Sequence, residues 1–261
     1  MNISFIGFGN MAKAMVQGLV GDDNVKLIQA ASPSLPIGTN AEGVKTHQDN
    51  LAILADADVI VLAVKPIQMG IIIQQINDAL PPNCLLLSIA ASISLPWFAK
   101  HSPKRPVVRA MPNLAAALNQ SATPLIANEF VTLKQKNLAT YIFDKLGLTT
   151  WTDNEEDLAI FTALSGSGPA YVFLFMDAMI QSAMSLGLTK ELATSFTLKT
   201  IQGALCLATQ TELNLNELRQ KVTSPGGTTA AAMEVFSQQG FETIIAEAMR
   251  AAHHRAQQLK N

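Results

Sequence analysis

Cysteine is scarce in this sequence, which limits what the chain can bind. Only Cys84 and Cys206 occur among 261 residues, and they lie far apart without the spacing of metal ligands. Cys84 lies within the apolar run from Cys84 to Ser88. We therefore expect two buried thiols in a reducing compartment, and no metal site.

An excess of charge of either sign is also lacking. The net charge is −2, and basic and acidic residues are interspersed along the chain. Proteins that bind nucleic acid or an anionic membrane usually carry a basic patch, so neither partner is expected. The segment Met1–Gly7 has neither the basic flank nor the apolar length of a signal peptide, and a cytoplasmic protein is the simplest interpretation.

No apolar run has the length and purity of a typical membrane span. The most apolar segment, Ala170–Leu186, is slightly short and is interrupted by Asp177 and Gln181. It is better explained as a helix that protein buries on all sides. Hydrophobic residues make up 49% of the chain, more than a monomer of this size usually hides, so we expect a partner subunit to cover this helix.

Short apolar runs alternate with helical patterns in the first part of the chain. The expected strands are Ile3–Ile6, Val25–Ala30, Val59–Val64, Leu85–Ile89, Val107–Arg109 and Pro124–Ala127, and the expected helices are Met11–Val20, Ile67–Leu80 and Leu133–Leu146. This alternation predicts a parallel sheet covered on both faces, an α/β doubly wound domain of the Rossmann type. Only helical patterns follow, so we expect domains at 1–154 and 155–261, the second entirely helical.

A glycine-rich turn follows the first expected strand and begins a helix. The run from Gly7 through Gly9 to Ala12 matches the G-x-G-x-x-G/A dinucleotide fingerprint in its required strand–turn–helix context. Gly7 would permit the tight turn, and Gly9 would let backbone amides approach a pyrophosphate at the helix N-terminus. The alternative is a glycine turn without a ligand. The context favours cofactor binding.

The end of the second expected strand bears on which dinucleotide is bound. It reads Ala30-Ala31-Ser32-Pro33-Ser34, without the acidic residue that would hold the ribose of NAD. Two hydroxyls are available to a 2′-phosphate instead, so we expect NADPH, with NADH as the alternative. Lys65 and Ala91 follow two further strands, where ligands of parallel sheets bind. A lysine in that position is otherwise an ordinary solvated loop residue.

Two blocks of small residues stand out in the helical part. One extends from Ala163 to Phe173, and the other is Val222-Thr-Ser-Pro-Gly-Gly-Thr-Thr229. The second is a Gly, Ser and Thr loop that begins a helix, and the free N–H groups there suit a carboxylate. A helix cap with a glycine hinge is the alternative.

Taken together, these blocks resemble the pyrroline-5-carboxylate reductase family. The likeness covers essentially the whole chain and includes Gly7-Phe-Gly9-Asn-Met11, Val64-Lys65-Pro66, Met111-Pro-Asn113, the block from Leu164 to Tyr171, and Val222–Thr229. The resemblance implies NADPH-dependent reduction of the C=N bond of 1-pyrroline-5-carboxylate to L-proline. It also implies an interlocked homodimer in which the substrate loop of one subunit closes over the cofactor of the other, and it leaves open whether dimers associate further into rings.

The resemblance also assigns residues. Cofactor contacts would be Gly7, Gly9, Asn10, Met11, Ser32, Asn50, Ala63, Val64, Lys65 and Ala91. Substrate contacts would be Glu155, Ser224, Gly226, Gly227, Thr228 and Thr229, with Glu155 near the ring and Thr229 as the catalytic residue that bonds the ring nitrogen directly or through a water. For Thr229, a hydroxyl that only caps its helix is the alternative.

Two other functions are weighed against this one. A β-hydroxyacid dehydrogenase shares a dinucleotide domain followed by helices, but it needs a lysine soon after its glycine-rich block, and residues 165–188 contain none. A non-catalytic NADPH-binding sensor would keep the glycine loops only as structure. The intact run Ser224–Thr229 argues against that second function.

Overall fold

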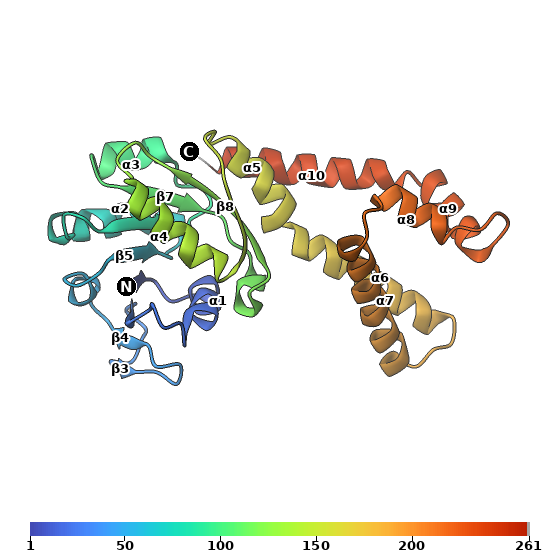
Figure 1. Cartoon of the computed structure of the whole chain (residues 1–261), viewed down its shortest axis with the longest axis horizontal. Coiled ribbons are helices and arrows are strands. Elements are labelled where there is room, and N and C mark those ends of the chain that lie inside the picture. The colour runs from blue at the N-terminus through green and yellow to red at the C-terminus, as the bar shows by residue number, and fades with distance from the viewer. Residues whose placement is uncertain (260–261) are drawn as a thin grey trace. The chain divides into compact units, whose positions relative to one another are not determined.

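The computed structural model describes residues 1–259, which form two compact units. Unit 1 comprises Met1–Gly166 with the chain from Ala252 onward, and unit 2 comprises Ser167–Ala251. Every strand described lies in unit 1, whereas unit 2 is built from helices (Figure 1). The predicted α/β fold with an added helical region is confirmed.

Unit 1 contains a sheet of 9 strands in the order β3-β4-β2-β1-β5-β6-β7-β8-β9. The strands are β1 (Asn2–Ile6), β2 (Leu27–Ala31), β3 (Gly38–Thr39), β4 (Lys45–His47), β5 (Val59–Leu62), β6 (Leu85–Ser88), β7 (Val107–Ala110), β8 (Ser121–Ala127) and β9 (Gly147–Trp151). From β4 to β7 in this order, all neighbours are parallel. This part is the doubly wound sheet that the alternating pattern predicts.

The sheet is mixed rather than wholly parallel, which corrects the prediction. β8 is antiparallel to β7, and β3 is antiparallel to β4. The β7–β8 connection holds only the short 3-10 helix η3 (Leu114–Leu118), and such a connection is too short for a parallel crossover. A full helix, α4 (Leu133–Asp144), connects β8 to β9, and these two strands are parallel.

Helices cover both faces of the sheet. α1 (Asn10–Leu19) and α4 pack against one hydrophobic cluster, whereas α2 (Pro66–Ile76) and α3 (Leu95–His101) pack against another. The 3-10 helix η1 (Asn50–Ile53) contributes Ile53 to the second cluster, and the 3-10 helix η2 (Asn77–Ala79) follows α2. β5 and β6 are buried throughout, and their alternate residues enter the two clusters. Burial on both faces explains why these strands are continuously apolar.

The remaining elements are helical. Unit 1 continues through α5 (Asp157–Phe161) and the π-helix η4 (Thr162–Gly166). Unit 2 contains α6 (Gly168–Ser185), α7 (Lys190–Gln210), α8 (Leu215–Lys221), α9 (Thr228–Gln238) and most of α10 (Phe241–Gln258). A capping box between Asn214 and Glu217 begins α8, and the Thr189 hydroxyl caps α7.

Apolar side chains of unit 2 are largely exposed within this one chain. α6 has no buried residue, and Phe173 and Leu174 are 66% and 72% exposed. One chain therefore does not bury this helix, and the expected cover by a partner subunit stays a prediction. Cys206 on α7 is likewise exposed, not buried as predicted, because α7 buries only Ala193 and Thr197.

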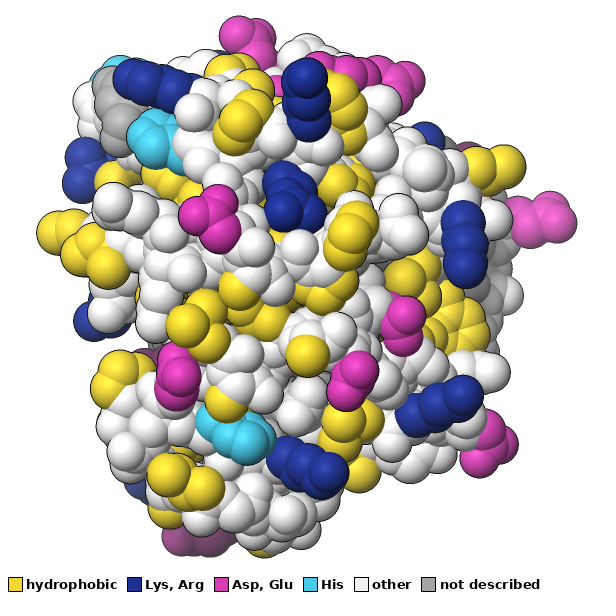
Figure 2. Space-filling view, turned by 90° about the vertical axis from the view of Figure 1, so that its left-hand side faces the viewer, with side chains coloured by type: hydrophobic (Ala, Val, Ile, Leu, Met, Phe, Trp, Pro, Cys, Tyr) yellow, Lys and Arg dark blue, Asp and Glu magenta, His cyan; other side chains and the backbone are white. Residues whose placement is uncertain are grey.

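The stretch Asp157–Ser185 is long and apolar enough to cross a membrane, judged by length and composition only. Within the chain, 17% of its most apolar window is buried. A helix of a soluble protein meets the same two criteria when protein covers it. On the face shown in Figure 2, Lys and Arg side chains are interspersed with Asp and Glu, and hydrophobic side chains lie between them.

Candidate active site

Carboxyl ends of neighbouring strands bring the predicted cofactor residues to one edge of the sheet. Gly7, Gly9, Asn10 and Met11 follow β1, Ser32 follows β2, Asn50 follows β4, Ala63, Val64 and Lys65 follow β5, and Ala91 follows β6. The strand order reverses at β1, which lies between β2 and β5. Doubly wound sheets bind ligands in the crevice outside such a switch point.

Gly7 and Gly9 have different roles in the β1–α1 turn. Gly7 has a φ of +87°, and a Cβ there would lie 2.6 Å from the carbonyl oxygen of Ala63. Gly9 has a φ of −80°, and a Cβ there would meet no atom within 4 Å. Neither backbone conformation nor packing requires glycine at position 9. The missing side chain leaves open space beside the free N–H groups of α1, and this fits the pyrophosphate of a dinucleotide.

Two serine hydroxyls lie together after β2. The Oγ atoms of Ser32 and Ser34 are 3.4 Å apart, and the Ser32 N–H donates to the His47 carbonyl at 3.1 Å. The run Ser32–Ser34 contains no carboxylate to repel a 2′-phosphate. The nearby Asn50 is buried, and its amide donates to Gln75 Oε1 at 2.8 Å.

Lys65 and Ala91 lie at the ends of β5 and β6 with exposed side chains. Lys65 is the N-cap residue of α2, and Pro66 occupies the first helical position. Ala91 lies in the connection from β6 to α3, and its carbonyl accepts a hydrogen bond from Arg109 Nη2 at 3.2 Å. Both positions therefore face solvent at the edge where the crevice opens.

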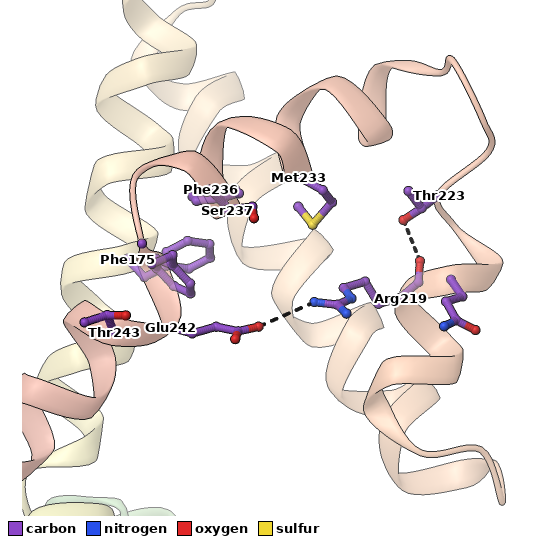
Figure 3. A pocket seen from close by; sticks show the side chains of 11 residues that line it. Phe175, Arg219, Thr223, Met233, Phe236, Ser237, Glu242 and Thr243 are labelled. Carbon is purple, nitrogen blue, oxygen red and sulfur yellow. Dashed lines mark hydrogen bonds and ion pairs between the residues drawn. The ribbon is translucent and has the colours of Figure 1, made fainter.

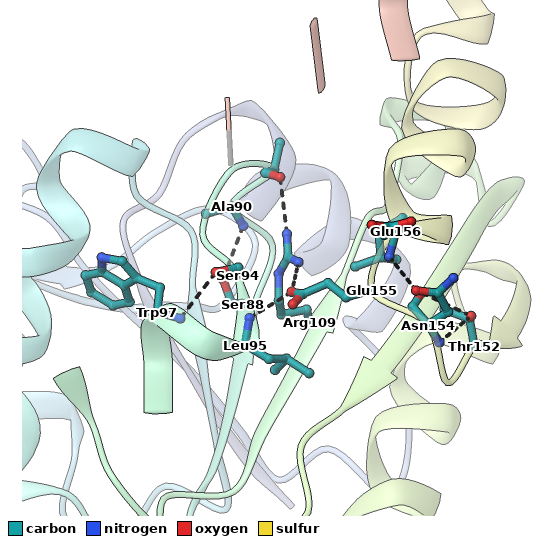
Figure 4. A network of polar contacts seen from close by, with 12 residues as sticks. Ser88, Ala90, Ser94, Leu95, Trp97, Arg109, Thr152, Asn154, Glu155 and Glu156 are labelled. Carbon is teal, nitrogen blue, oxygen red and sulfur yellow. Dashed lines mark hydrogen bonds and ion pairs between the residues drawn. The ribbon is translucent and has the colours of Figure 1, made fainter. Parts of the chain in front are cut away.

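Arg109 and Glu155 form an ion pair in unit 1 (Figure 4). Arg109 lies on β7 and is 3% exposed, while Glu155 follows β9. Glu155 Oε1 accepts hydrogen bonds from Arg109 Nη1 and from the backbone N–H of Leu95, the latter at 2.7 Å. Burial lowers the pKa of the Arg109 guanidinium, and the Glu155 carboxylate opposes that shift.

Sequence reasoning did not single out Arg109. It was treated only as the last residue of an expected strand, although a cation at the end of an apolar strand needs a partner once it is buried. That requirement is the signal that could have identified the pair. Glu155 was assigned to the substrate ring by resemblance, and the structure places its carboxylate on Arg109 and Leu95.

The Met111-Pro-Asn113 block holds the π-helix in place. The Asn113 side chain donates to the Ser165 carbonyl at 3.0 Å and accepts from the Ala115 N–H. Its backbone N–H donates to Ser121 Oγ. One π-turn leaves helical carbonyls without their usual partners, and Asn113 satisfies one of them. Two motifs that are distant in the sequence thus form one local structure in unit 1.

The block Val222–Thr229 forms a loop between α8 and α9 in unit 2. Gly226 has a φ of +68°, and the Gly227 N–H donates to the Ser224 carbonyl at 3.0 Å. Gly227 is the N-cap residue of α9, whose first turn has no acidic side chain. Thr228 and Thr229 are the first residues of that helix, where backbone N–H groups have no intrahelical acceptor. The loop can therefore hold an anion such as a carboxylate.

Unit 2 also contains two cavities. One, of about 770 Å³, lies among residues of α8, α9 and the start of α10, with Arg219 and Glu242 3.8 Å apart across it (Figure 3). The other, of about 690 Å³, is almost wholly apolar and follows α6 and α10. Both are lined largely by the side chains that a single chain leaves exposed.

A matching family model defines the broad class. Residues 2–92 match the model described as NADP oxidoreductase coenzyme F420-dependent. This region carries the glycine turn and the switch point between β2 and β5. Fold and site therefore define an oxidoreductase with a dinucleotide domain and a helical unit.

Closer relatives identify the family. Residues 155–259 match the model described as pyrroline-5-carboxylate reductase dimerisation. A pyrroline-5-carboxylate reductase of Pseudomonas aeruginosa is 40% identical over 265 residues, which covers 98% of this chain and 96% of the relative. The chain belongs to the pyrroline-5-carboxylate reductase family.

Solved structures of the same family share the fold of this chain. A pyrroline-5-carboxylate reductase from Coxiella burnetii matches with a TM-score of 0.89 and 40% identity, covering 100% of this chain and 98% of that one. The Plasmodium falciparum pyrroline carboxylate reductase, solved with NADP bound, matches with a TM-score of 0.93 and 26% identity over the same shares of the two chains. The architecture of both units is thus shared with solved members of the family.

Proposed function

We propose that this chain reduces the C=N bond of 1-pyrroline-5-carboxylate with NADPH and releases L-proline, the last step of proline biosynthesis. The observation that supports this best is the relative at 40% identity, because it aligns with 98% of the chain and so includes both the dinucleotide crevice and the Val222–Thr229 loop. A β-hydroxyacid dehydrogenase would need a lysine after the glycine-rich block, and residues 165–188 provide none.

Residues at the sheet edge would hold the cofactor. When bound, NADPH supplies a hydride from C4 of its nicotinamide. The open space at Gly9 and the N-terminus of α1 would accept the pyrophosphate, and the paired hydroxyls of Ser32 and Ser34 would bond the 2′-phosphate. Asn10, Met11, Asn50 and the segments Ala63–Lys65 and Ala91 would complete the crevice.

The loop of unit 2 would hold the substrate. Ser224, Gly226, Gly227 and Thr228 would form a cradle of hydroxyl and backbone N–H groups for the carboxylate at the start of α9. The Thr229 hydroxyl, or a water that it holds, would bond the ring nitrogen. Water can supply the proton to a cyclic imine near neutral pH, so a site made mainly of hydroxyls and amides suffices. The chain then contributes orientation and electrostatics.

The functional division, the assembly and the location are part of the same proposal. We assign residues 1–154 to cofactor binding and 155–261 to substrate binding and dimerisation, which the dimerisation match at 155–259 supports. The exposed apolar side chains of α6 favour a homodimer, and a cytoplasmic location and rings of dimers are further parts of the proposal. Glu155 lies in unit 1, beside Arg109.

The decisive experiment follows NADPH oxidation by its near-ultraviolet absorbance, with purified protein and 1-pyrroline-5-carboxylate. We expect turnover of the five-membered imine with a higher kcat/KM for NADPH than for NADH. Parallel reactions with a six-membered cyclic imine and with β-hydroxyacids test the substrate class. Tight NADPH binding without turnover of any imine would contradict the proposal and favour a sensor.

A further inference from the structure

The Arg109–Glu155 pair joins three segments of unit 1. Arg109 comes from β7, Glu155 follows β9, and residues 89–94 connect β6 to α3. Because β8 runs back along β7 and β9 runs parallel to β8, the chain after β9 returns to the level of Arg109. Sheet topology thus brings the carboxylate to a guanidinium that lies far away in the sequence.

Both members of the pair bind the backbone of the β6–α3 segment. Arg109 Nη2 donates to the carbonyl of Ala91, within this connection, at 3.2 Å. Glu155 Oε1 accepts from the N–H of Leu95, the first residue of α3, at 2.7 Å. In Figure 4 the two side chains point toward each other with this segment beside them. One ion pair therefore holds both the middle of this connection and the start of the helix that follows it.

We infer that Arg109 and Glu155 are positioning residues for the cofactor, because they fix the segment that carries Ala91 at the edge of the dinucleotide crevice. Glu155 then acts on NADPH through this backbone instead of through the imine ring. The inference rests on the proposed function only in taking Ala91 as a cofactor contact. The Glu155 carboxylate binds a buried guanidinium and a backbone N–H, and both contacts hold this segment.

Substitution of Glu155 separates this role from a substrate contact. Glu155→Ala removes the acceptor of Leu95 and the counter-ion of Arg109. We expect the dissociation constant of NADPH to rise about tenfold, in line with a lost charge-assisted hydrogen bond, and the KM for 1-pyrroline-5-carboxylate to stay within about twofold. Glu155→Gln keeps an oxygen for Leu95 and should restore most of the loss, leaving a rise of about threefold.

The dissociation constant is measured by fluorescence titration of NADPH without substrate, so it does not depend on turnover. Glu156→Ala is the matched control, because this neighbouring carboxylate is exposed, and both constants should stay at the wild-type values. A rise in the imine KM with unchanged NADPH affinity would overturn the inference, and so would no change in either constant. If Glu155→Ala does not fold, the dissociation constant of NADPH and the imine KM are measured on Glu155→Gln instead. The same two results would then overturn the inference. Failure of the wild type to reduce imines would contradict the proposed function alone.

Discussion

Thr229 is the residue on which the proposed chemistry depends most directly. It is the second residue of α9, in the turn whose backbone N–H groups would hold the carboxylate. Thr229→Ala should lower kcat/KM for the imine roughly ten- to a hundredfold, the effect of one lost transition-state hydrogen bond. NADPH affinity should not change. Thr229→Ser keeps the hydroxyl at the same position and should restore most of kcat/KM. Wild-type kinetics in Thr229→Ala would mean that the Thr229 hydroxyl only caps its helix and takes no part in the reaction.

The two glycines of the β1–α1 turn allow fold and cofactor binding to be separated. Gly9→Ala should melt near the wild-type temperature, because φ is −80° and its Cβ would meet no atom within 4 Å. It should nevertheless weaken NADPH binding at least tenfold, because the methyl group enters the space proposed for the pyrophosphate.

Gly7→Ala should behave differently and lose stability itself. A left-handed φ costs a non-glycine residue roughly 1–2 kcal/mol, and the contact with the Ala63 carbonyl adds to this. Thermal melts and NADPH titration on both variants provide the comparison. Normal NADPH affinity in Gly9→Ala would show that the pyrophosphate does not bind at this turn.

Among the elements, the turn after α1 is attached to α4 through Asp22. Its carboxylate pairs with Lys145 at 2.8 Å and accepts a hydrogen bond from the Tyr141 hydroxyl. Lys145 and Tyr141, with the backbone N–H of Asn24, hold the pKa of Asp22 well below its ordinary value. Because the pKa of Asp22 is lower in the folded protein than in the unfolded chain, the charged carboxylate stabilises the fold. This stabilisation is complete at pH values where the carboxylate is also charged in the unfolded chain. That contribution is present above about pH 4 and is lost as the pH falls further.

Asp22→Asn should therefore melt below the wild type near neutral pH, with a difference that shrinks as the pH falls below about 4. Asp23→Asn is the control, because the side chain of Asp23 is exposed. Melting curves of the three proteins from about pH 3 to 7 test this. A constant difference between Asp22→Asn and the wild type at every pH would contradict an electrostatic origin.

How far the sequence predicts an element depends on how completely that element is buried. β5 and β6 lie between two layers of helices, so their continuous apolar runs are unambiguous. β9 was missed because its residues are partly or fully exposed, and β3 because two exposed residues in a Gly- and Pro-rich stretch carry no pattern. The reversed direction of β8 depends on a short connection, and apolar runs do not report direction.

Some parts of the candidate site can also be predicted from the sequence, and others cannot. The residues that follow strands were predictable, because a parallel sheet places them at one edge. Arg109 and its bonds to Ala91 and Glu155 were not, because they join β6, β7 and the chain after β9. Such contacts depend on pairing between distant strands, and no local pattern encodes them.

For the whole molecule, mixed variants can reveal whether two subunits share a site. The resemblance implies that the loop of one subunit closes over the cofactor of the other. Gly9→Ala damages only the cofactor side and Thr229→Ala only the substrate side. A heterodimer of the two would then contain one intact site, and random pairing should restore about a quarter of wild-type activity.

Co-expression of the two variants with different tags allows the heterodimer to be isolated and assayed. Each variant alone should stay at its own low rate, which supplies the control. Activity of the heterodimer no higher than the mean of its parents would mean that each site lies within one subunit.

The two edges of the nine-stranded sheet should differ in how they affect solubility. At one edge β3 has only two residues, too few to pair with a strand from another molecule. At the other edge β9 offers five residues, of which Leu148 is 73% exposed. An exposed edge strand of this length can pair with the same strand of another molecule. Leu148→Lys should therefore slow aggregation of the heated protein, measured by light scattering. The rate of imine reduction should not change. β9, the strand that returns the chain to Arg109, is thus also where aggregation should begin.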